Sequence, residues 1–568
     1  MVEQLPRKEQ VSGSNPLGGS NSKTQMILWI ETRGGVVENQ TQVVIVGGGH
    51  NGLTAAAYLA KAGVNVKVLE RLDEFGGAAV SAQAFEGVEA RLSRYSYLVS
   101  LLPKQIIDDL ELDIALAPRR YSSYTPIAGE AFGLLVDNED SSVTKSSFSE
   151  VGADADFESW NEFYEDTQQL AREVWPSVLE PLRTRSWWKQ NITNPDLWDE
   201  FVEKPIGNVI ADKFSNEWVR GVVYTDALIG TFSSNHDETL NANRCFLYHV
   251  IGGGTGDWNV PIGGMGKVSA ELRDSAIRNG AELISDAEVT KIVPSNEGAT
   301  VYYTSQGQQY EIETRLVLAN SARQELDLLL DEASEKSVET ASGAYPHGAQ
   351  VKVNLLLSRL PKLKDPKLSP EAAFGGTFHV NESFDQLQRA YEAANKGEIP
   401  SPLPCEIYCH SLTDPSILGS QLSEAGAQTL TVFALHAPHK LVANLTEAEH
   451  DSMRSELERA VLDSLNSVLS EPIEDLLLKD VKGSPCIETK TTRDLEQALR
   501  LPGGNIFHQP LSWPFVEDDQ PLETPAQKWG VETDHDAVLI CGSSARRGGA
   551  VSGIAGHNAA MAALELLE

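Results

Sequence analysis

Residues 42–79 read QVVIVGGGHNGLTAAAYLAKAGVNVKVLERLDEFGGAA, and this stretch decides the fold. It opens on the apolar, β-branched run 43–46, which predicts a buried parallel strand. Gly47, Gly49 and Gly52 follow in the pattern GxGxxG, and apolar residues then recur at helical spacing up to residue 63. Residues 64–69 predict a second strand that ends on Glu70. Strand, glycine turn, helix and second strand together predict a dinucleotide-binding unit.

Each residue of the motif has a physical task. Gly47 permits the tight turn, Gly49 lets a pyrophosphate approach the backbone, and Gly52 lets the helix pack closely on the strand. Asn51 lies in the same turn, where the helix N-terminus offers unpaired N–H groups to phosphate oxygens. Glu70 stands near the spacing at which a carboxylate accepts hydrogen bonds from the ribose. A glycine turn that binds nothing is the alternative, and the surrounding strands and helix disfavour it.

After Glu70 come Arg71, four further residues and then Gly76, Gly77 and Ala78. This E-R-x4-G-G pattern resembles the FAD-binding flavoprotein family of phytoene desaturases, carotenoid ketolases and isomerases, to which the amine oxidases are more distantly related. Within this family, the sequence GGGHNGL…GGAAV is most similar to the branch named for pyridine nucleotide-disulfide oxidoreductase domain-containing protein 2. The likeness continues through SRYSYLVSLLP, PIGGMGKV, GGNIFH and CGSSARRGGAVSGIAGHNAA. It implies FAD as the cofactor, with the paired glycines beside its pyrophosphate and ribitol.

The resemblance also assigns residues further along the chain. It implies that the backbone of Val289 contacts adenine and that a glycine loop after residue 541 faces the flavin ring. From that loop we take Gly542, Val551, Ser552 and Gly553 as flavin contacts. The family pattern is nearer P-G-G-G-V-S-G, so Arg547 and Ala550 depart from it. The Arg547 guanidinium either stabilises reduced flavin or, with that of Arg546, points to solvent.

The resemblance implies an α/β fold: a Rossmann-type, glutathione-reductase-like FAD-binding domain with an inserted α+β substrate domain and a helical cap. We assign residues 41–150, 245–335 and 496–568 to the FAD-binding domain, and 151–244 with 336–495 to the substrate and cap domain. Residues 1–40 lack apolar periodicity and are expected to form a disordered tail. Alternation predicts antiparallel strands at 300–303 and 310–313, and residues 316–319 predict a fully buried strand.

Two stretches leave alternatives open. Residues 154–235 carry six tryptophans at helical periodicity, which favours a cap filled by its own aromatics over a lining for a substrate tunnel. The run CFLYHVI at 245–251 reads as a strand, and the glycines after it invite comparison with a second dinucleotide motif. Pro261 and the lack of an amphipathic helix behind those glycines argue against that comparison, so we expect one dinucleotide.

Composition excludes several function classes. A formal net charge of −35 disfavours nucleic-acid binding, since that affinity depends on Lys and Arg neutralising phosphates. No run reaches the length of a membrane span, although an apolar patch could still contact a membrane surface. Five scattered cysteines without a CxxC pair predict neither a disulfide framework nor dithiol chemistry, and they favour a cytoplasmic setting. No metal-ligand cluster is expected.

The sequence therefore predicts an FAD-dependent oxidoreductase in which the flavin accepts a hydride and the protein orients the substrate and excludes water. His249 and His508, with Arg94 and Tyr95 behind them, are the candidates for proton transfer, each weighed against a structural role. The desaturase resemblance implies an apolar, polyene or lipid-like substrate. With one dinucleotide site, a quinone, O₂ or another diffusible acceptor would take the electrons. The alternative is a regulatory flavoprotein with structural FAD and a protein partner.

Overall fold

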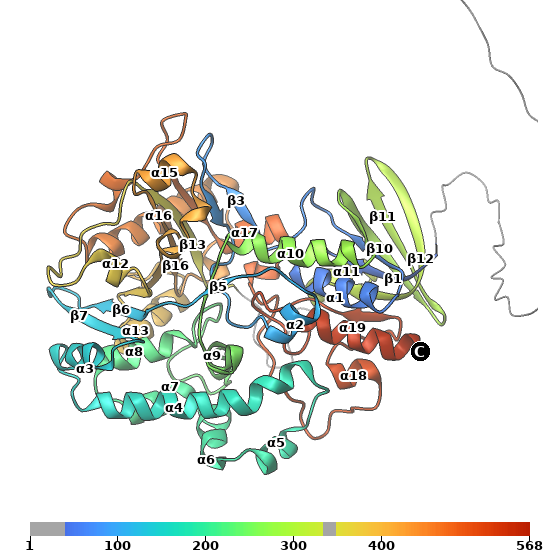
Figure 1. Cartoon of the computed structure of the whole chain (residues 1–568), viewed down its shortest axis with the longest axis horizontal. Coiled ribbons are helices and arrows are strands. Elements are labelled where there is room, and N and C mark those ends of the chain that lie inside the picture. Colours follow the sequence, from blue (N-terminus) through green and yellow to red (C-terminus); the bar gives the residue numbers. More distant parts are fainter. Residues whose placement is uncertain (1–39, 333–347) are drawn as a thin grey trace, which may run out of the picture. The chain divides into compact units, whose positions relative to one another are not determined.

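The computed structural model describes residues 40–332 and 348–568, and these form one compact unit. The tail predicted for residues 1–40 lies outside the described residues, apart from Gln40. Two large sheets organise the unit, and Figure 1 shows them side by side with most of the helices around them.

The first sheet contains the predicted dinucleotide unit. Its strand order is β10-β11-β12-β1-β2-β9, with β18 paired to β12. The pairs of β1 with β12 and β2, of β2 with β9, and of β12 with β18 are parallel, whereas β10, β11 and β12 pair antiparallel. Its strands are β1 (Thr41–Val46), β2 (Val66–Leu69), β9 (Glu282–Ile284), β10 (Ala287–Ser295), β11 (Gly298–Ser305), β12 (Gln308–Ala319) and β18 (Val538–Ile540).

β12 is one continuous strand where the sequence predicted two. Its first half alternates between exposed and buried residues beside β11, whereas Leu316 to Ala319 are buried between β1 and β18. The backbone continues straight through Thr314, which is paired with both Ala299 and Thr41. The change of pattern thus marks the point where helices begin to cover both faces of the sheet, not a turn.

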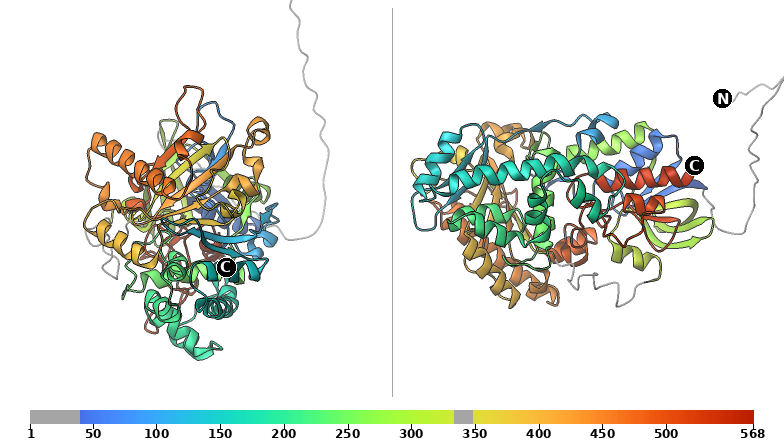
Figure 2. Two further views of the ribbon diagram at one scale, coloured as in Figure 1. Left: turned by 90° about the vertical axis from the view of Figure 1, so that its left-hand side faces the viewer. Right: turned by 90° about the horizontal axis from the view of Figure 1, so that it is seen from below.

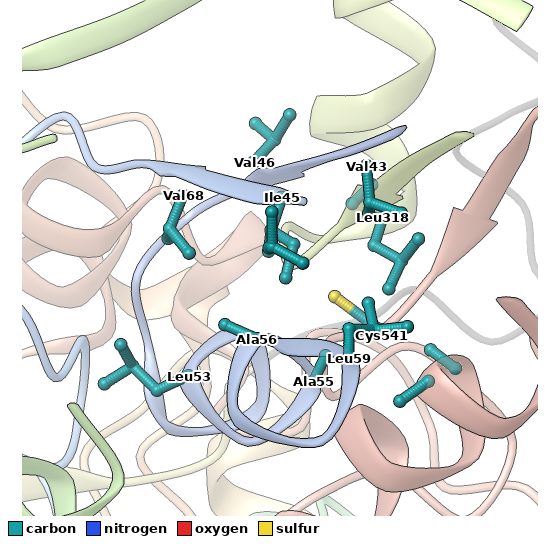
Figure 3. Packing of buried hydrophobic residues seen from close by; sticks show 14 of the residues in the cluster. Val43, Ile45, Val46, Leu53, Ala55, Ala56, Leu59, Val68, Leu318 and Cys541 are labelled. Carbon is teal, nitrogen blue, oxygen red and sulfur yellow. The ribbon is translucent and has the colours of Figure 1, made fainter. Parts of the chain in front are cut away.

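Three helices pack together against the first sheet: α1 (His50–Lys61), α10 (Met265–Arg278) and α19 (Ile554–Leu567) (Figure 1). Figure 3 shows Ala56 and Leu59 on the side of α1 that faces Ile45 of β1, and Leu53 belongs to the same cluster. Small residues permit this close approach: a Cβ on Gly556 of α19 would lie 2.0 Å from the carbonyl oxygen of Asn51. The α1 N-terminus is therefore fixed by packing on two sides.

The second sheet has the order β17-β13-β16-β15-β14-β6-β7. Its strands are β6 (Tyr121–Pro126), β7 (Gly133–Asp137), β13 (Val351–Leu357), β14 (Thr377–Val380), β15 (Cys405–Tyr408), β16 (Gln428–Ala434) and β17 (Ile487–Lys490). Helix α16 (Glu447–Asn466) begins at a capping box of Thr446 and Glu449 and buries Leu457, Val461 and Leu465 in this sheet's core. β6 pairs with β14, although the sequence assigned residues 121–137 to the FAD-binding domain. The second sheet thus begins before residue 150; the remaining domain bounds stay a prediction.

Helices of residues 141–251 form a layer that lies below the second sheet in the view of Figure 1, and Figure 2 shows the long α4 running through it. Those used below are α4 (Asp156–Val174), α8 (Glu217–Thr225) and α9 (Asn241–Ile251). The strand predicted at 245–251 is wrong, since these residues belong to α9. Residues 245–251 of α9 are all buried, so this run is largely apolar without an amphipathic period and resembles a buried strand. Within residues 40–332 and 348–568, no helix combines the length and apolarity that crossing a membrane requires.

Candidate functional site

The loop between β1 and α1 presents the helix N-terminus to open space. Gly47 has φ +99°, and its N–H donates to the Leu69 carbonyl at 2.8 Å. A Cβ on Gly52 would lie 2.3 Å from the Gly47 carbonyl oxygen, so glycine is required there for packing. Gly49 is the N-cap of α1 and supplies no side chain to the first-turn N–H groups. Those groups are left for a ligand, and an anion is the ligand they favour.

A second loop, after β2, closes on the first. The Glu70 carboxylate accepts the N–H of Gly48 at 2.7 Å and that of Leu72 at 2.8 Å, and its side chain is buried. Gly76 donates its N–H to the Gly48 carbonyl at 2.9 Å, and a Cβ on Gly77 would lie 3.1 Å from the Gly49 Cα. Two glycine-lined loops therefore form one cradle, with a fixed carboxylate at its edge.

The cradle opens into a chamber of about 250 Å³. At one end the chamber is charged, where β2, β10 and α11 (Arg323–Leu329) meet α17 (Thr492–Leu499). Arg500 forms an ion pair with Glu288, and Arg71 donates to the Ala498 carbonyl at 2.7 Å. The charged residues that line the chamber are Glu70, Arg71, Glu288, Glu325 and Arg500, all at this nucleotide end.

The other end, called here the aromatic end, contains rings and aliphatic side chains. Tyr97 and Phe433 have ring centroids 4.7 Å apart, and His249 stacks on Trp258 at 4.8 Å. Other lining residues of this end include Leu98, Ile229, Tyr248, Ile506, Phe507 and Leu511. In the described part of the chain no Asp, Glu, Lys or Arg lines it. The aromatic end thus offers apolar surface and no fixed charge.

Unpaired polar atoms lie between the two ends. His50 Nε2, Asn51 Oδ1, Ser321 Oγ and His508 Nδ1 are buried in residues that line the chamber, and none has a hydrogen-bond partner among the described residues. Burial lowers the pKa of both His50 and His508 to about 4, so both rings are neutral at pH 7. Orphaned polar atoms beside a free helix N-terminus fit a polar, phosphate-bearing group, which supports a dinucleotide in this position.

The predicted cofactor residues divide into two sets. Those lining the chamber are Gly47, Gly49, Asn51, Glu70, Arg71, Gly77, Ala78, Val289 and Val551. Gly52, Gly76, Gly542, Ser552 and Gly553 lie behind the wall, where glycine serves packing: a Cβ on Gly542 would lie 3.1 Å from the Asn320 Oδ1 atom. Direct contact of either set with FAD remains a prediction.

The four candidates for proton transfer are not brought together. His249 lines the aromatic end, while His508 lies next to His50 near the start of α1. Tyr95 lines the chamber. Arg94 lies outside it, because its guanidinium pairs with Glu488 of β17 at 2.6 Å. Arg94 therefore fixes the loop after β4 (Arg91–Ser93) instead of facing the chamber.

Neither expectation for Arg547 describes its position. The side chain is 1% exposed, and its guanidinium donates to the carbonyls of Ser177, Glu180 and Trp529. It is thus turned away from the chamber and also from solvent. Arg546, half-buried, donates to the Phe515 carbonyl at 2.8 Å. The loop backbone still reaches the chamber through Gly548 to Val551.

Several chamber residues were missed by the sequence analysis. Asn320 follows β12 directly, donates to the Gly47 carbonyl at 3.0 Å and lines the chamber. Its position at the carboxyl end of a parallel strand was a usable signal, because ligands bind at that edge. Trp258 and Tyr97 lie in irregular segments without such a signal. The six cap tryptophans do not line the chamber, and four of them, Trp160, Trp175, Trp188 and Trp198, pack in the core of the cap, whereas Trp187 is 40% exposed.

The chain is similar to known proteins along most of its length. Residues 45–103 match the family model of an NAD(P)-binding Rossmann-like domain. An uncharacterized protein of Mycobacterium tuberculosis is 50% identical over 535 residues, which cover 92% of this chain and 97% of that protein. Pyridine nucleotide-disulfide oxidoreductase domain-containing protein 2 of Mus musculus is 30% identical, covering 93% of this chain and 94% of that protein. The chain belongs to this family.

This chain shares its fold with amine oxidases of known structure. Putrescine oxidase and cyclohexylamine oxidase from Brevibacterium oxydans each superpose with a TM-score of 0.52 at 16% identity, over 93% of this chain and 99–100% of theirs. A more partial relative, a limonene dehydrogenase component of Castellaniella defragrans, is 27% identical over 46% of this chain and 47% of its own. FAD is the cofactor of the Rossmann-type domain, and the family is one of flavin-dependent oxidoreductases.

Proposed function

We propose that this oxidoreductase removes a hydride from an uncharged, apolar substrate of polyene or other lipid-like character. A quinone, O₂ or another diffusible acceptor would then take up the electrons. The observation that carries the proposal is the aromatic end of the chamber, where rings and aliphatic chains form the lining and no charged side chain among the described residues takes part.

The chain's residues would hold FAD along the chamber. Glu70 would accept hydrogen bonds from the ribose, the α1 N-terminus would bind the pyrophosphate, and residues 548–551 would face the flavin ring. Bound FAD supplies a two-electron acceptor for hydride. The protein's own part is to orient the substrate against the rings of Tyr97, Trp258 and Phe433 and to exclude water.

The uncharged lining of the aromatic end favours a neutral substrate over a cationic amine. A cationic ammonium group in the aromatic end would lose its hydration and gain no carboxylate there. Burial also lowers the pKa of His249 to about 4, so this ring is neutral at pH 7 and brings no charge of its own. Limonene, in the name of a partial relative, is an uncharged hydrocarbon, whereas the putrescine oxidase neighbour was solved with an amine. The lining favours the first kind of molecule.

Anaerobic reduction of the bound flavin tests the proposal. Purified holoprotein is mixed with matched pairs of compounds, each an apolar alkene or alcohol and the primary amine on the same carbon skeleton. We expect at least one neutral member to bleach the flavin absorbance while its amine partner leaves it unchanged. Faster bleaching by the amines would contradict the proposal. If dithionite reduces the flavin and no compound does, the regulatory flavoprotein is favoured instead.

A further inference from the structure

Behind the aromatic end lies a buried cluster of ionisable side chains that the proposed reaction leaves unused. Glu406 of β15, His379 of β14 and Glu382 after β14 are 2%, 5% and 0% exposed. One nitrogen or carboxylate oxygen from each residue lies within 4.8 Å of those of the other two. His379 Nδ1 is 2.5 Å from Glu382 Oε2, and Glu382 Oε1 is buried without a partner in the described chain. The cluster is therefore buried, and one of its carboxylate oxygens has no hydrogen-bond partner among the described residues.

Two tyrosines connect this cluster to the chamber. The Tyr408 hydroxyl donates to Glu406 Oε2 at 2.6 Å, and its oxygen lies 3.3 Å from the Tyr97 hydroxyl. Their ring centroids are 4.2 Å apart, and Tyr97 lines the aromatic end beside Trp258. A continuous row of hydrogen-bonding groups thus leads from the substrate end to a buried carboxyl. Each tyrosine hydroxyl can accept one proton while it donates another.

The charges of the cluster require bound protons. Glu406, Glu382 and Asp226, at the end of α8, bring three carboxyls, and the positive side chain facing them in the described chain is Arg119. Arg119 donates to the Trp258 carbonyl and the Thr377 hydroxyl at 3.0 Å each, not to a carboxylate. Two buried carboxylates and a half-buried one against a single cation are too costly, so protons neutralise part of the charge.

Burial raises the pKa of each of the three carboxyls. Burial, with the neighbouring Glu382 charge, raises the pKa of Glu406 to about 8. Burial raises the pKa of Asp226 to about 6 and that of Glu382 well above its usual range. The titratable and charged groups around Glu406 are His379, Glu382, Tyr408, Tyr97, Arg119, Asp226, Cys245 and Cys405. The carboxyls titrate as a coupled group.

We propose that Glu406, Glu382 and His379 form a proton store, and that Tyr97 and Tyr408 carry protons between it and the chamber. The inference rests on the proposed function, because removal of a hydride from a substrate also releases a proton. That proton binds the Tyr97 oxygen as the Tyr97 proton moves to Tyr408 and the Tyr408 proton moves to ionised Glu406. The reverse sequence returns it to the chamber. One proton moves at each step, and no electrons are transferred along the path.

The histidines of the chamber cannot store the released proton themselves. Burial lowers the pKa of His249 to about 4, as it does for His508, so neither holds a proton at neutral pH. A carboxyl that titrates near neutrality suits the task better, because it exchanges protons in both directions at the working pH. Tyr97 is thus the contact through which the chamber reaches a group of suitable pKa.

Infrared spectroscopy of the holoprotein tests the store without a substrate. A protonated carboxylic acid has a carbonyl band that a carboxylate lacks. We expect this band in wild-type protein at pH 7, a decrease in its intensity as pH rises through about 8, and a clear decrease at pH 7 in Glu406→Gln. Glu382→Gln is the second variant if Glu406→Gln fails to fold. Equal bands in wild type and both variants would overturn the proposal, as would a stoichiometric divalent metal found by elemental analysis.

The path is tested by kinetics in the same instrument. After a rapid jump to alkaline pH, loss of the Glu406 band should slow by about tenfold or more in Tyr408→Phe, because the hydroxyl bridge is gone. Tyr124→Phe is the matched control, since Tyr124 donates to the Asp365 carboxylate at 2.9 Å on another part of the sheet. Equal rates in wild type and Tyr408→Phe would overturn the path. Either result is independent of which substrate the enzyme oxidises.

Discussion

Gly49→Val is expected to abolish FAD binding while the protein still folds. Gly49 has φ −72° and ψ 170°, a conformation open to valine, so its glycine is needed for space and not for the backbone. A Cβ there would lie 3.0 Å from Asn320 Nδ2 and 3.8 Å from the Gly77 Cα, inside the cradle formed by the two loops. The branched side chain would occupy the volume that a pyrophosphate needs above α1.

The measurement is the flavin content of purified Gly49→Val, followed by its melting temperature. Because a ligand at 100 times its Kd stabilises the native state by about 2.7 kcal/mol, the variant should melt near wild type stripped of flavin. Stripped wild type is the matched control, since it lacks the ligand and keeps the glycine. A Gly49→Val protein that retains flavin at full stoichiometry would show that the dinucleotide binds elsewhere.

Arg547→Met is expected to lower the free energy of unfolding by about 3 kcal/mol or more, because hydrogen bonds to charged groups contribute about 1.5–3 kcal/mol each. The guanidinium joins the carbonyls of Ser177 and Glu180, in one segment, to the carbonyl of Trp529, in another that is far away in the sequence. Burial lowers its pKa to about 10, so it remains charged at pH 7. Methionine fills the space and leaves the carbonyls unpaired.

Chemical denaturation of both arginine variants measures this effect. Arg546→Met is the matched control: its side chain is half-buried and donates to the Phe515 carbonyl and, at 3.3 Å, to the exposed Gln520 Oε1, so a smaller loss of about 1 kcal/mol is expected. The reduction potential of the bound flavin should be the same in wild type and Arg547→Met. Unchanged stability together with a shifted potential would instead support the first expectation from the sequence, a guanidinium acting on the flavin.

The part of the fold that local sequence rules govern was predictable. The strand, glycine turn and helix of residues 41–61 follow from β-branched residues, three glycines and a change of periodicity. The errors arise where tertiary contacts decide. α9 resembles a strand because its residues 245–251 are all buried, and β6 joins the second sheet by pairing with β14, more than 200 residues later. Nothing local encodes either placement.

In the candidate site, too, residues of a local motif were predictable and residues brought together by the fold were not. Gly47, Gly49 and Glu70 stand in a contiguous motif, and all three line the chamber. Tyr97, Trp258 and Phe433 are far apart in the chain, so only the fold brings them together. Arg547 directly precedes the chamber-lining residues 548–551 in the sequence. Its side chain nevertheless points away from the chamber, because it donates hydrogen bonds to carbonyls of other segments.

Flavin release from wild-type protein tests the central claim, one FAD held in this cradle without a covalent bond. All five cysteines are buried and none lines the chamber, so no thiol is placed to form a tether. Acid denaturation should move all yellow colour into the supernatant, and chromatography should identify it as FAD at one molecule per chain. Colour retained in the pellet, or a protein purified with NAD(P) or without any nucleotide, would contradict the account.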